Sequence, residues 1–396
     1  MTEYLLSELL KIKNGRDHKH LEDGEIPVYG SGGIMRYANE SLYEEESILL
    51  PRKGTLDNIQ YANTPFWTVD TIYYTVINKE KANAYYLYQY LKLLDLSNLN
   101  SGTGVPSMTF GAYYGIKINL PELEVQKQIA KVLSDLDAKI EVNNKISQEL
   151  EALAKTIFDY WFVQFDFPDQ NGKPYKSFGG RMVYSEELKR EIPEGWKVKE
   201  LKEIADCIMG QSPKGETYNQ DGVGMPLLNG PADYENGSLK ARTYTTDPKR
   251  TCQKDDLVLC IRATIGNLVY SEDEFCLGRG VAAVRTKDEK LSELVYYLLL
   301  QEIERFKVHA TGSIIRGITK EDLTDSKCLI PSDDYINAFH NQINPIFDKI
   351  RINKKENQNL AALRDWLLPM LMNGQVTVSE AKEHLGMVAE DGETYK

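Results

Sequence analysis

Two long stretches of the chain carry hydrophobic residues at helical spacing. In the first, which begins at Ile129, apolar residues recur at alternating steps of four and three, and the second, beginning at Phe339, repeats this pattern. Such steps place the apolar residues along one seam of an α-helix, as in a coiled coil. At 1.5 Å per residue, about 35 residues make a rod of roughly 50 Å. The predicted seams consist of Leu136, Ile140, Asn143, Ile146, Leu150, Leu153 and Tyr160 in the first helix, and of Ile346, Ile350, Asn353, Leu360 and Leu363 in the second.

A single apolar seam is unstable in water, so each helix needs a partner, and the other helix of the same chain is the obvious one. We expect an antiparallel coiled coil, which would place the blocks that precede the helices at opposite ends of the rod. Asn143 and Asn353 interrupt the seams. Each either fixes the register as a buried polar residue or faces solvent, and the pattern leaves both alternatives open. Pro345 lacks the N–H that a helix interior uses, so we expect it to shorten or kink the second helix.

Short runs of β-branched and aromatic residues, separated by Gly-rich turns, precede each long helix and predict strands. Because regular helices do not separate these strands, a doubly wound sheet is not expected. The pattern instead predicts an α+β fold, in which two globular blocks with curved, partly barrel-like sheets are separated by the two long helices. The predicted strands lie at 47–50, 71–77, 257–261 and 281–284, and a short amphipathic helix follows in each block near 85–94 and 294–306.

An internal repeat relates the two halves of the chain. Pairing residue i with residue i + 210 places Asn143 on Asn353 and Leu150 on Leu360. Upstream the offset drifts by a few residues, as loop insertions would cause, and a period this long excludes a solenoid. We therefore expect a pseudo-two-fold tandem. Its parts are a block at 1–121, a helix at 122–162, a crossover linker at 163–195, a block at 196–333, a helix at 334–374 and a tail at 375–396.

Charge limits where a nucleic-acid surface can lie. The 396 residues are 42% hydrophobic and 27% charged, which is typical of globular proteins, and the formal net charge is −12. This charge excludes a uniformly basic nucleic-acid coat but not a local basic face. The stretch 121–170 holds 5 basic and 10 acidic residues. Any nucleic-acid surface is therefore expected on the two blocks rather than on the first helix.

The cysteine content and the N-terminus bear on the compartment. The five cysteines are odd in number and form no CxxC pair, which argues against a disulfide framework or a zinc site. The N-terminus has no basic-then-apolar signal pattern, and the apolar runs are far shorter than the ~20 residues that span a bilayer. We expect a reduced cytoplasmic protein that does not bind a membrane.

Several stretches, in order and twice over, resemble the specificity subunits of type I restriction–modification systems. They are YGSGG (29–33), LLPRKGTLDN (49–58), INLPELEVQKQIAKVL (118–133), IPEGW (192–196), GQSPKGETYN (210–219), DLVLCIRATIGNLVY (256–270), FCLGRGVAAVR (275–285) and the helix at 339–372. The resemblance implies two target-recognition domains, each reading one half of a two-part double-stranded DNA target. It also implies that the helices set the spacing and dock two methyltransferase (M) subunits. Whether restriction (R) subunits also bind stays open.

The resemblance further implies that this chain has no catalytic residues, metal or cofactor. S-adenosylmethionine, ATP and Mg²⁺ are expected on the partner subunits. Base edges in the major groove are read by side chains with paired donors and acceptors, and phosphates are held by Lys, Arg and the N–H groups of glycine turns. Because a single such residue is more often a solvated surface residue, our hypothesis rests on clusters of them. The DNA-binding candidates are Ser31, Gly32, Arg36, Arg52, Lys53, Thr55, Asn58, Gln60, Ser101, Thr103 and Ser107 in the first block, and Ser212, Lys214, Arg242, Lys249, Arg250, Arg262, Thr264, Asn267, Arg279, Thr311, Ser313 and Arg316 in the second.

Two alternative functions remain open. Pro168-Asp169 followed by Glu187-Leu188-Lys189 has the residue types with which restriction nucleases hold magnesium, so the chain is alternatively a Mg²⁺-dependent DNA nuclease using Asp169, Glu187 and Lys189. Their position in the crossover linker counts against this alternative. In the third hypothesis the helices assemble a complex that does not bind DNA.

Other motifs are near misses. Gly210 and Gly215 have Walker A spacing, but Glu216 stands where the lysine is needed. The pair His18-x-His20 lies in a polar loop beside Lys19, where solvated side chains are more common than metal ligands.

Overall fold

Two long helices run through the chain, as the seam pattern predicts. The computed structural model describes residues 1–54, 56–96, 99, 106–235, 237–262, 265–309, 317–381 and 383. The chain forms two units, of which unit 1 comprises Met1–Lys145 with Asn353–Lys396 and unit 2 comprises Ile146–Ile352. Helix α4 (Leu123–Phe158) and helix α8 (Asp333–Asn373) each contribute one section to each unit. Every unit therefore combines an α+β part with a section of both long helices.

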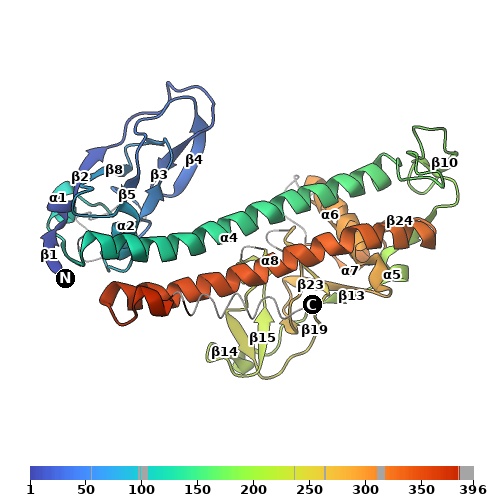
Figure 1. Cartoon of the computed structure of the whole chain (residues 1–396). Helices are drawn as coiled ribbons and strands as arrows, with labels where there is room; N and C mark the ends of the chain where they lie inside the picture. The colour runs from blue at the N-terminus through green and yellow to red at the C-terminus, as the bar shows by residue number, and fades with distance from the viewer. Residues whose placement is uncertain are drawn as a thin grey trace. The chain divides into compact units, whose positions relative to one another are not determined.

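Unit 1 combines small sheets and a strand pair with short helices (Figure 1). The first sheet is antiparallel and runs β2 (Leu10–Asn14), β8 (Ile72–Ile77), β5 (Ser47–Pro51), β6 (Gln60–Ala62). The second runs β4 (Gly33–Ala38), β3 (Ile26–Gly30), β7 (Trp67–Thr68), with β3 and β7 parallel. Strand β1 (Thr2–Leu5) pairs with β9 (Lys117–Leu120), and the helices are α1 (Leu6–Leu9), α2 (Ala84–Lys92) and α3 (Phe110–Tyr114).

The hydrophobic core of unit 1 joins the sheets to the helix pair. Asn83 caps α2 by accepting a hydrogen bond from the N–H of Tyr86 at 2.9 Å. Tyr86 and Leu87 on the buried face of α2 share one core with Leu133 of α4 and Leu367 of α8, and all four are fully buried. The α+β part of unit 1 is therefore continuous with the helix pair in its packing.

Unit 2 repeats this arrangement with additional strands. One sheet runs β13 (Ala205–Met209), β23 (Val281–Thr286), β20 (Leu257–Cys260), β21 (Leu268–Tyr270), and β12 (Lys197–Glu200) pairs with β24 (Lys327–Ile330). The other runs β14 (Tyr218–Asn219), β18 (Thr243–Thr245), β15 (Met225–Leu228), β22 (Phe275–Leu277), β19 (Thr251–Cys252), with β15 and β22 parallel. Two hairpins, β10 (Met182–Ser185) with β11 (Arg190–Pro193) and β16 (Tyr234–Glu235) with β17 (Ser238–Leu239), and the helices α5 (Leu201–Ile204), α6 (Ser292–His309) and α7 (Lys320–Thr324) complete it.

The matching sheet orders confirm the internal repeat and locate its insertion. From β2 to β13 the offset is 205 − 10 = 195, whereas from β5 to β20 it is 257 − 47 = 210, as it is from α4 to α8 (333 − 123). The second copy has therefore gained 15 residues between β13 and β20, a stretch that includes the β16–β17 hairpin. This insertion explains why the offset drifts in the N-terminal part of each block.

Hydrogen bonds across the helix seam fix the section of the helix pair in unit 1. The amide nitrogen of Asn143 donates to Glu356 and to Asn357, both at 2.9 Å, and that of Asn357 donates to Asn144 at 2.8 Å. Asn143 and Asn353 are 2% and 0% exposed, so both seam asparagines are buried rather than solvated. Later residues of α4 meet earlier residues of α8, which confirms the antiparallel pairing.

In unit 2 aromatic residues fill the seam, and three predicted seam positions, Ile146, Leu153 and Tyr160, are exposed instead. Leu153 is 49% exposed, whereas the neighbouring Ala154 is fully buried. Ala154 shares a core with Phe158, at the end of α4, and with Phe339, near the start of α8, whose rings lie 6.4 Å apart. A helix with 3.6 residues per turn drifts off a strict seven-residue repeat. The small Ala154 therefore takes the inner position next to bulky rings, and Leu153 turns outward.

The other predicted seam residues are buried or half-buried, and Pro345 lies inside the second helix. Leu136 and Leu360 are buried, and Ile140, Leu150, Ile346, Ile350 and Leu363 are half-buried. Pro345 does not shorten the second helix, because α8 begins twelve residues before it, at Asp333. Its side chain is exposed, so Pro345 lies on the solvent side of the helix. The carbonyl one turn earlier, which receives no hydrogen bond because proline has no N–H, can bind water there.

Aromatic residues anchor the start of the crossover linker in unit 2. Phe165 and Phe167 are 3% and 1% exposed, and the ring of Phe167 stacks on Trp196 at 4.9 Å. The carboxylate of Asp166 accepts hydrogen bonds from the N–H and hydroxyl of Ser177 at 2.7 and 2.6 Å. This part of the linker is therefore packed on the unit rather than exposed along its length.

Candidate nucleic-acid interface

Three loops of unit 1 meet at Thr71, which lies between β7 and β8. The N–H of Ser31 in the β3–β4 turn donates to the Thr71 hydroxyl at 3.3 Å. The N–H groups of Arg52 and Lys53, just after β5, donate to the Thr71 carbonyl at 2.9 and 3.2 Å. We call this group of residues, together with those that brace it, loop cluster 1.

Further hydrogen bonds brace loop cluster 1. The Asn58 amide nitrogen donates to the Ser31 carbonyl at 2.7 Å, and that of Gln60 donates to the Gly30 carbonyl at 3.0 Å. Lys53 forms an antiparallel bridge with Ser107. The structure thus brings together six of the sequence-predicted candidates: Ser31, Arg52, Lys53, Asn58, Gln60 and Ser107. Because Asn58 and Gln60 use their amide nitrogens to hold the turn, they position the loop.

The two arginines of this block differ in what holds them. The Arg52 guanidinium lies 5.9 Å from the centre of the Tyr73 ring and donates to the Asp70 carbonyl at 3.3 Å, leaving its side chain half-exposed at the rim of the cluster. Arg36 instead donates to Asp23 at 2.9 Å and to the Leu21 carbonyl at 3.1 Å. Arg36 is therefore committed to contacts within the unit and does not join loop cluster 1.

Unit 2 presents Arg279 on a turn that only glycine can form. A Cβ on Gly280 would lie 2.0 Å from the carbonyl oxygen of Asn229, and one on Gly210 would lie 2.0 Å from that of Gly278. The backbones therefore pack at a distance that excludes any side chain. The Ser212 hydroxyl accepts hydrogen bonds from the N–H and Nε of Arg279 at 3.4 and 3.3 Å, and Arg279 is exposed.

Arg262 lies beside this turn, in the place that Arg52 takes in unit 1. It lies two residues after the end of β20, and the intervening Ile261 donates its N–H to the Gly280 carbonyl at 2.9 Å. The Ile261 carbonyl also accepts a hydrogen bond from the N–H of Ile318 at 2.9 Å. These two hydrogen bonds fix the backbone from which the exposed Arg262 side chain projects. We call Ser212, Arg262, Arg279 and the glycines around them loop cluster 2.

The other candidates lie elsewhere on unit 2 or outside the described residues. Lys214 and Lys249 are ion-paired with Glu216 and Asp247 at 3.8 and 2.7 Å. Arg242 and Arg250 are exposed, whereas Asn267 is half-buried and its carbonyl accepts from the N–H of Cys260 at 3.1 Å. Gly32 is exposed in the turn of loop cluster 1. Thr55, Ser101, Thr103, Thr264, Thr311, Ser313 and Arg316 fall outside the described residues.

Sequence reasoning did not select one basic segment close to loop cluster 1. Residues 11–20 hold Lys11, Lys13, Arg16 and Lys19, all exposed. The available signal was four basic residues and one acidic residue within ten positions, in a chain of net charge −12.

The geometry does not favour the nuclease alternative. The Asp169 carboxylate accepts two hydrogen bonds from the N–H groups of Asn171 and Lys173, both at 2.8 Å, so it is used in closing its own turn. Glu187 is 3.7 Å from the ammonium of Lys327. Within the described part of the chain, no group of three or more His, Cys, Asp or Glu residues is arranged to hold a metal ion.

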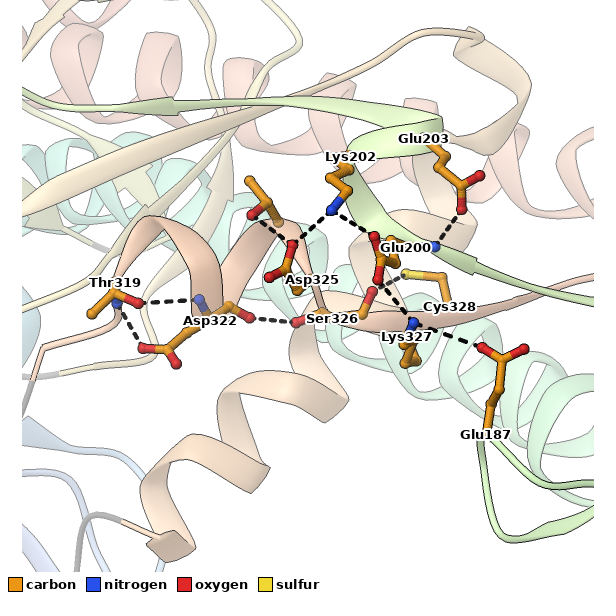
Figure 2. Close-up of polar contacts among 11 residues, drawn as sticks. Glu187, Glu200, Lys202, Glu203, Thr319, Asp322, Asp325, Ser326, Lys327 and Cys328 are labelled. Carbon is orange, nitrogen blue, oxygen red and sulfur yellow. Dashed lines mark hydrogen bonds and ion pairs between the residues drawn. The ribbon is translucent and has the colours of Figure 1, made fainter.

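A network of ion pairs joins the linker hairpin of unit 2 to its strand pair (Figure 2). Glu200 lies 2.6 Å from Lys202 and 2.9 Å from Lys327, and Lys202 also reaches Asp325 at 3.0 Å. Hydrogen bonds from Lys202 and Lys327 lower the pKa of Glu200 to about 2. These charges neutralise one another, so the network holds β12 against β24 and α7 and presents no single-sign surface to a ligand.

Comparison with known proteins agrees with the duplicated fold. The family model described as the type I restriction modification DNA specificity domain matches residues 1–152 and again residues 193–362. The chain belongs to this family of specificity subunits. In this specificity subunit, the two matched stretches cover the two copies of the four-stranded sheet and its surroundings.

Relatives of this specificity subunit occur in archaea and bacteria. A Methanocaldococcus jannaschii protein assigned as the MjaX type I restriction enzyme specificity subunit is 30% identical over 76% of this chain and 70% of that protein. The MjaIX specificity subunit of the same organism is 25% identical over 86% and 79% of the two chains. The crystal structure of the type I S subunit from M. genitalium superposes with a TM-score of 0.60 at 16% identity, covering 93% and 95%, and so shares the fold. None of the helices that the structure describes is long and apolar enough to pass through a bilayer.

Proposed function

We propose that this chain is the non-catalytic DNA-specificity subunit of a type I restriction–modification complex and that each unit reads one half of a two-part DNA target. The observation that carries the proposal is the duplication of loop clusters 1 and 2. Both clusters begin where a buried central strand ends, β5 in one unit and β20 in the other, and both present an arginine there, Arg52 or Arg262. Two similar surfaces on one chain fit a target with two separated halves.

The clusters have the properties that DNA recognition requires. Their backbones are braced by hydrogen bonds, so little conformational freedom is lost when DNA binds. Arg52, Arg262 and Arg279 carry planar guanidinium groups that can pair with guanine or bridge phosphates. Neither cluster contains a set of carboxylates or a nucleophile–base pair. Their chemistry therefore fits binding, and S-adenosylmethionine, ATP and Mg²⁺ would be held by partner subunits.

The long helices fit the roles of spacer and docking surface. Helices α4 and α8 each run without interruption from one unit to the other, and their seam is held by hydrogen bonds in unit 1 and by aromatic rings in unit 2. On α4 of unit 2, Ile146 and Leu153 form an exposed apolar stripe, seven residues apart and 40% and 49% exposed, and Tyr160 follows in the π-helical turn Asp159–Val163 at 40% exposure. Such a stripe is suited to an amphipathic helix of a methyltransferase subunit, of which we expect two per complex.

The proposal is tested by the DNA that the complex modifies. The chain is co-expressed with its methyltransferase partner, and the methylated positions in the host DNA are mapped. We expect a motif with two specified halves and an unspecified spacer. Removing two heptads from each long helix should shorten the accepted spacer and leave the halves unchanged. A contiguous motif, or no methylation and no binding of DNA at low salt, would instead indicate a complex without split-site recognition.

A further inference from the structure

We propose that the basic segment of residues 11–20 in unit 1 is a second DNA contact, which holds the phosphate backbone next to loop cluster 1. This inference rests on the proposed function and extends it to residues outside the recognition loops. The cations concerned are Lys11, Lys13, Arg16 and Lys19, which we call the phosphate track.

The charge of the phosphate track stands out from its surroundings. Residues 11–20 carry four Lys or Arg and one Asp, a net charge of +3, in a chain whose net charge is −12. Two other exposed lysines of unit 1 are neutralised, since Lys79 and Lys117 lie 2.7 and 3.0 Å from glutamate carboxylates. No ion pair engages the cations of the phosphate track among the residues that the structure describes. Unneutralised cations on an acidic protein indicate a polyanionic partner.

Strand β2 presents two of these cations from the edge of a sheet. β2 pairs only with β8, and its residues alternate between core and solvent. Leu10 and Ile12 are 2% and 4% exposed, whereas Lys11 and Lys13 point away from the core and are exposed. Because side chains two residues apart on a strand share a face, the two ammonium groups lie along one line. A line of cations along a strand matches the line of phosphates along a DNA strand.

The chain after β2 is clamped so that Arg16 faces solvent. The Arg16 N–H donates to the Thr68 carbonyl at 2.8 Å, and the Arg16 carbonyl accepts from Trp67 Nε1 at 3.1 Å. A Cβ on Gly15 would lie 2.0 Å from the carbonyl oxygen of Val69, so the backbone can approach β7 only because residue 15 is glycine. The exposed Arg16 guanidinium therefore projects from a backbone whose conformation is fixed, which reduces the conformational entropy lost on binding.

The phosphate track is continuous with loop cluster 1. Asn14, at the end of β2, is the strand partner of Tyr73, and the Arg52 guanidinium lies over that same tyrosine ring. Thr68, which anchors Arg16, is the strand partner of Tyr29, two residues before Ser31 of the cluster. The track and the cluster therefore occupy the same end of both sheets, and one DNA duplex can contact both.

Unit 2 lacks counterparts of three of the four track cations, and the fourth, Lys19, corresponds to Lys214, which is paired with Glu216 at 3.8 Å. At the offset of 195 that relates β2 to β13, Lys11 and Lys13 correspond to Asp206 and Ile208, and Arg16 corresponds to Gln211. The track is therefore a feature of unit 1 alone. Lysine ammonium groups are point charges that hold phosphates without reading bases, so the contribution should not depend on the DNA sequence.

The test compares two pairs of substitutions in the complex with the methyltransferase partner. One variant carries Lys11→Gln with Lys13→Gln. The matched control carries Lys79→Gln with Lys117→Gln, which removes the same charge from ion-paired, exposed lysines of the same unit. The Kd for a duplex with the target and for an unrelated duplex is measured between 50 and 200 mM salt. Thermal unfolding checks that both variants are folded.

Each phosphate contact contributes about 0.9 to the slope of log K against log salt. We expect the Lys11/Lys13 variant to lose about 1.8 of this slope and to bind both duplexes more weakly, with the methylated motif unchanged. The control should keep the slope of the unaltered complex. An unchanged slope in the Lys11/Lys13 variant, or weakening on the target duplex alone, would overturn the phosphate track while leaving the proposed function intact. If the unaltered complex binds neither duplex, the proposed function fails and the track with it.

Discussion

Arg364 of α8 donates a hydrogen bond of 2.7 Å to the carboxylate of Asp137 on α4. The other oxygen of Asp137 accepts from the Tyr85 hydroxyl of α2, and the Gln89 amide donates to that hydroxyl at 2.8 Å. Three helices of unit 1 are therefore joined through one carboxylate. At the offset of 210, Asp137 and Arg364 correspond to Phe347 and Ala154, so unit 2 makes its equivalent joint with apolar groups.

Replacing Asp137 with Asn should weaken the joint between the recognition block and the helix pair. Asp137 and Arg364 side chains are 33% and 27% exposed, and a charged hydrogen bond in such a half-buried place contributes about 1–3 kcal/mol. We expect a loss of that size in the free energy of unfolding, measured by denaturant titration. Asp135→Asn is the control, because Asp135 forms an exposed i,i+4 pair with Lys131 on the same helix and should cost under about 0.5 kcal/mol. Equal losses in the two variants would contradict the role of Asp137.

Substituting Gly280 with Ala should disrupt loop cluster 2 selectively. The added Cβ would meet the Asn229 carbonyl oxygen at 2.0 Å, so the Arg279 turn must move. We expect methylation to lose specificity in one half of the motif while the other half persists, as read from the mapped methylated positions. Gly215→Ala is the control, because no atom lies within 4 Å of its added Cβ. A motif unchanged in both halves by Gly280→Ala would show that this turn does not contribute to recognition.

Replacing Leu153 with Asp should weaken assembly with the methyltransferase subunit and leave the fold intact. Leu153 is 49% exposed, so the free energy of unfolding should change by less than about 1 kcal/mol. A carboxylate in the middle of the exposed apolar stripe should nevertheless weaken binding of the methyltransferase subunit at least tenfold, measured by calorimetry or co-purification. Gln148→Asp adds the same group at an exposed position off the stripe and should bind normally. Normal assembly of the Leu153 variant would place the docking surface elsewhere.

The contribution of Glu200 to stability should depend on pH. Its folded pKa of about 2 lies below the ordinary 4.5, so its ion pairs stabilise the folded state above pH 4.5, and this contribution is lost as the pH falls toward 2. We expect Glu200→Gln to be less stable than the unaltered chain at pH 7, with the difference shrinking between pH 4.5 and 2. Glu216→Gln, at a loose 3.8 Å pair with Lys214, should show no such trend. A difference that is constant over this range would contradict the ion-pair network.

Local patterns were sufficient to predict the long helices, the central strands of the two four-stranded sheets and the repeat. The steps of four and three that lead to α4 and α8 repeat over many turns, and the match of Asn143 with Asn353 is a property of the letters alone. The loop clusters were predicted in part, because arginine after a buried strand is visible in the sequence. The brace at Thr71 was not, because its hydrogen bonds join residues that are 18 to 40 positions apart.

The sequence by itself determined that this chain is a tandem of two similar units with long apolar seams, because periodicity and repetition need no knowledge of contacts. Only the tertiary structure decided which side chains are exposed and which are engaged in contacts within the fold. Leu153 faces solvent because the small Ala154 takes the inner position next to the rings, and Arg36 is held within the unit because folding brings Asp23 within 2.9 Å. The tertiary structure likewise decided that Lys11 and Lys13 are exposed and have no ion pair among the described residues. Whether a charge is neutralised depends on neighbours distant along the chain, and only folding sets those distances.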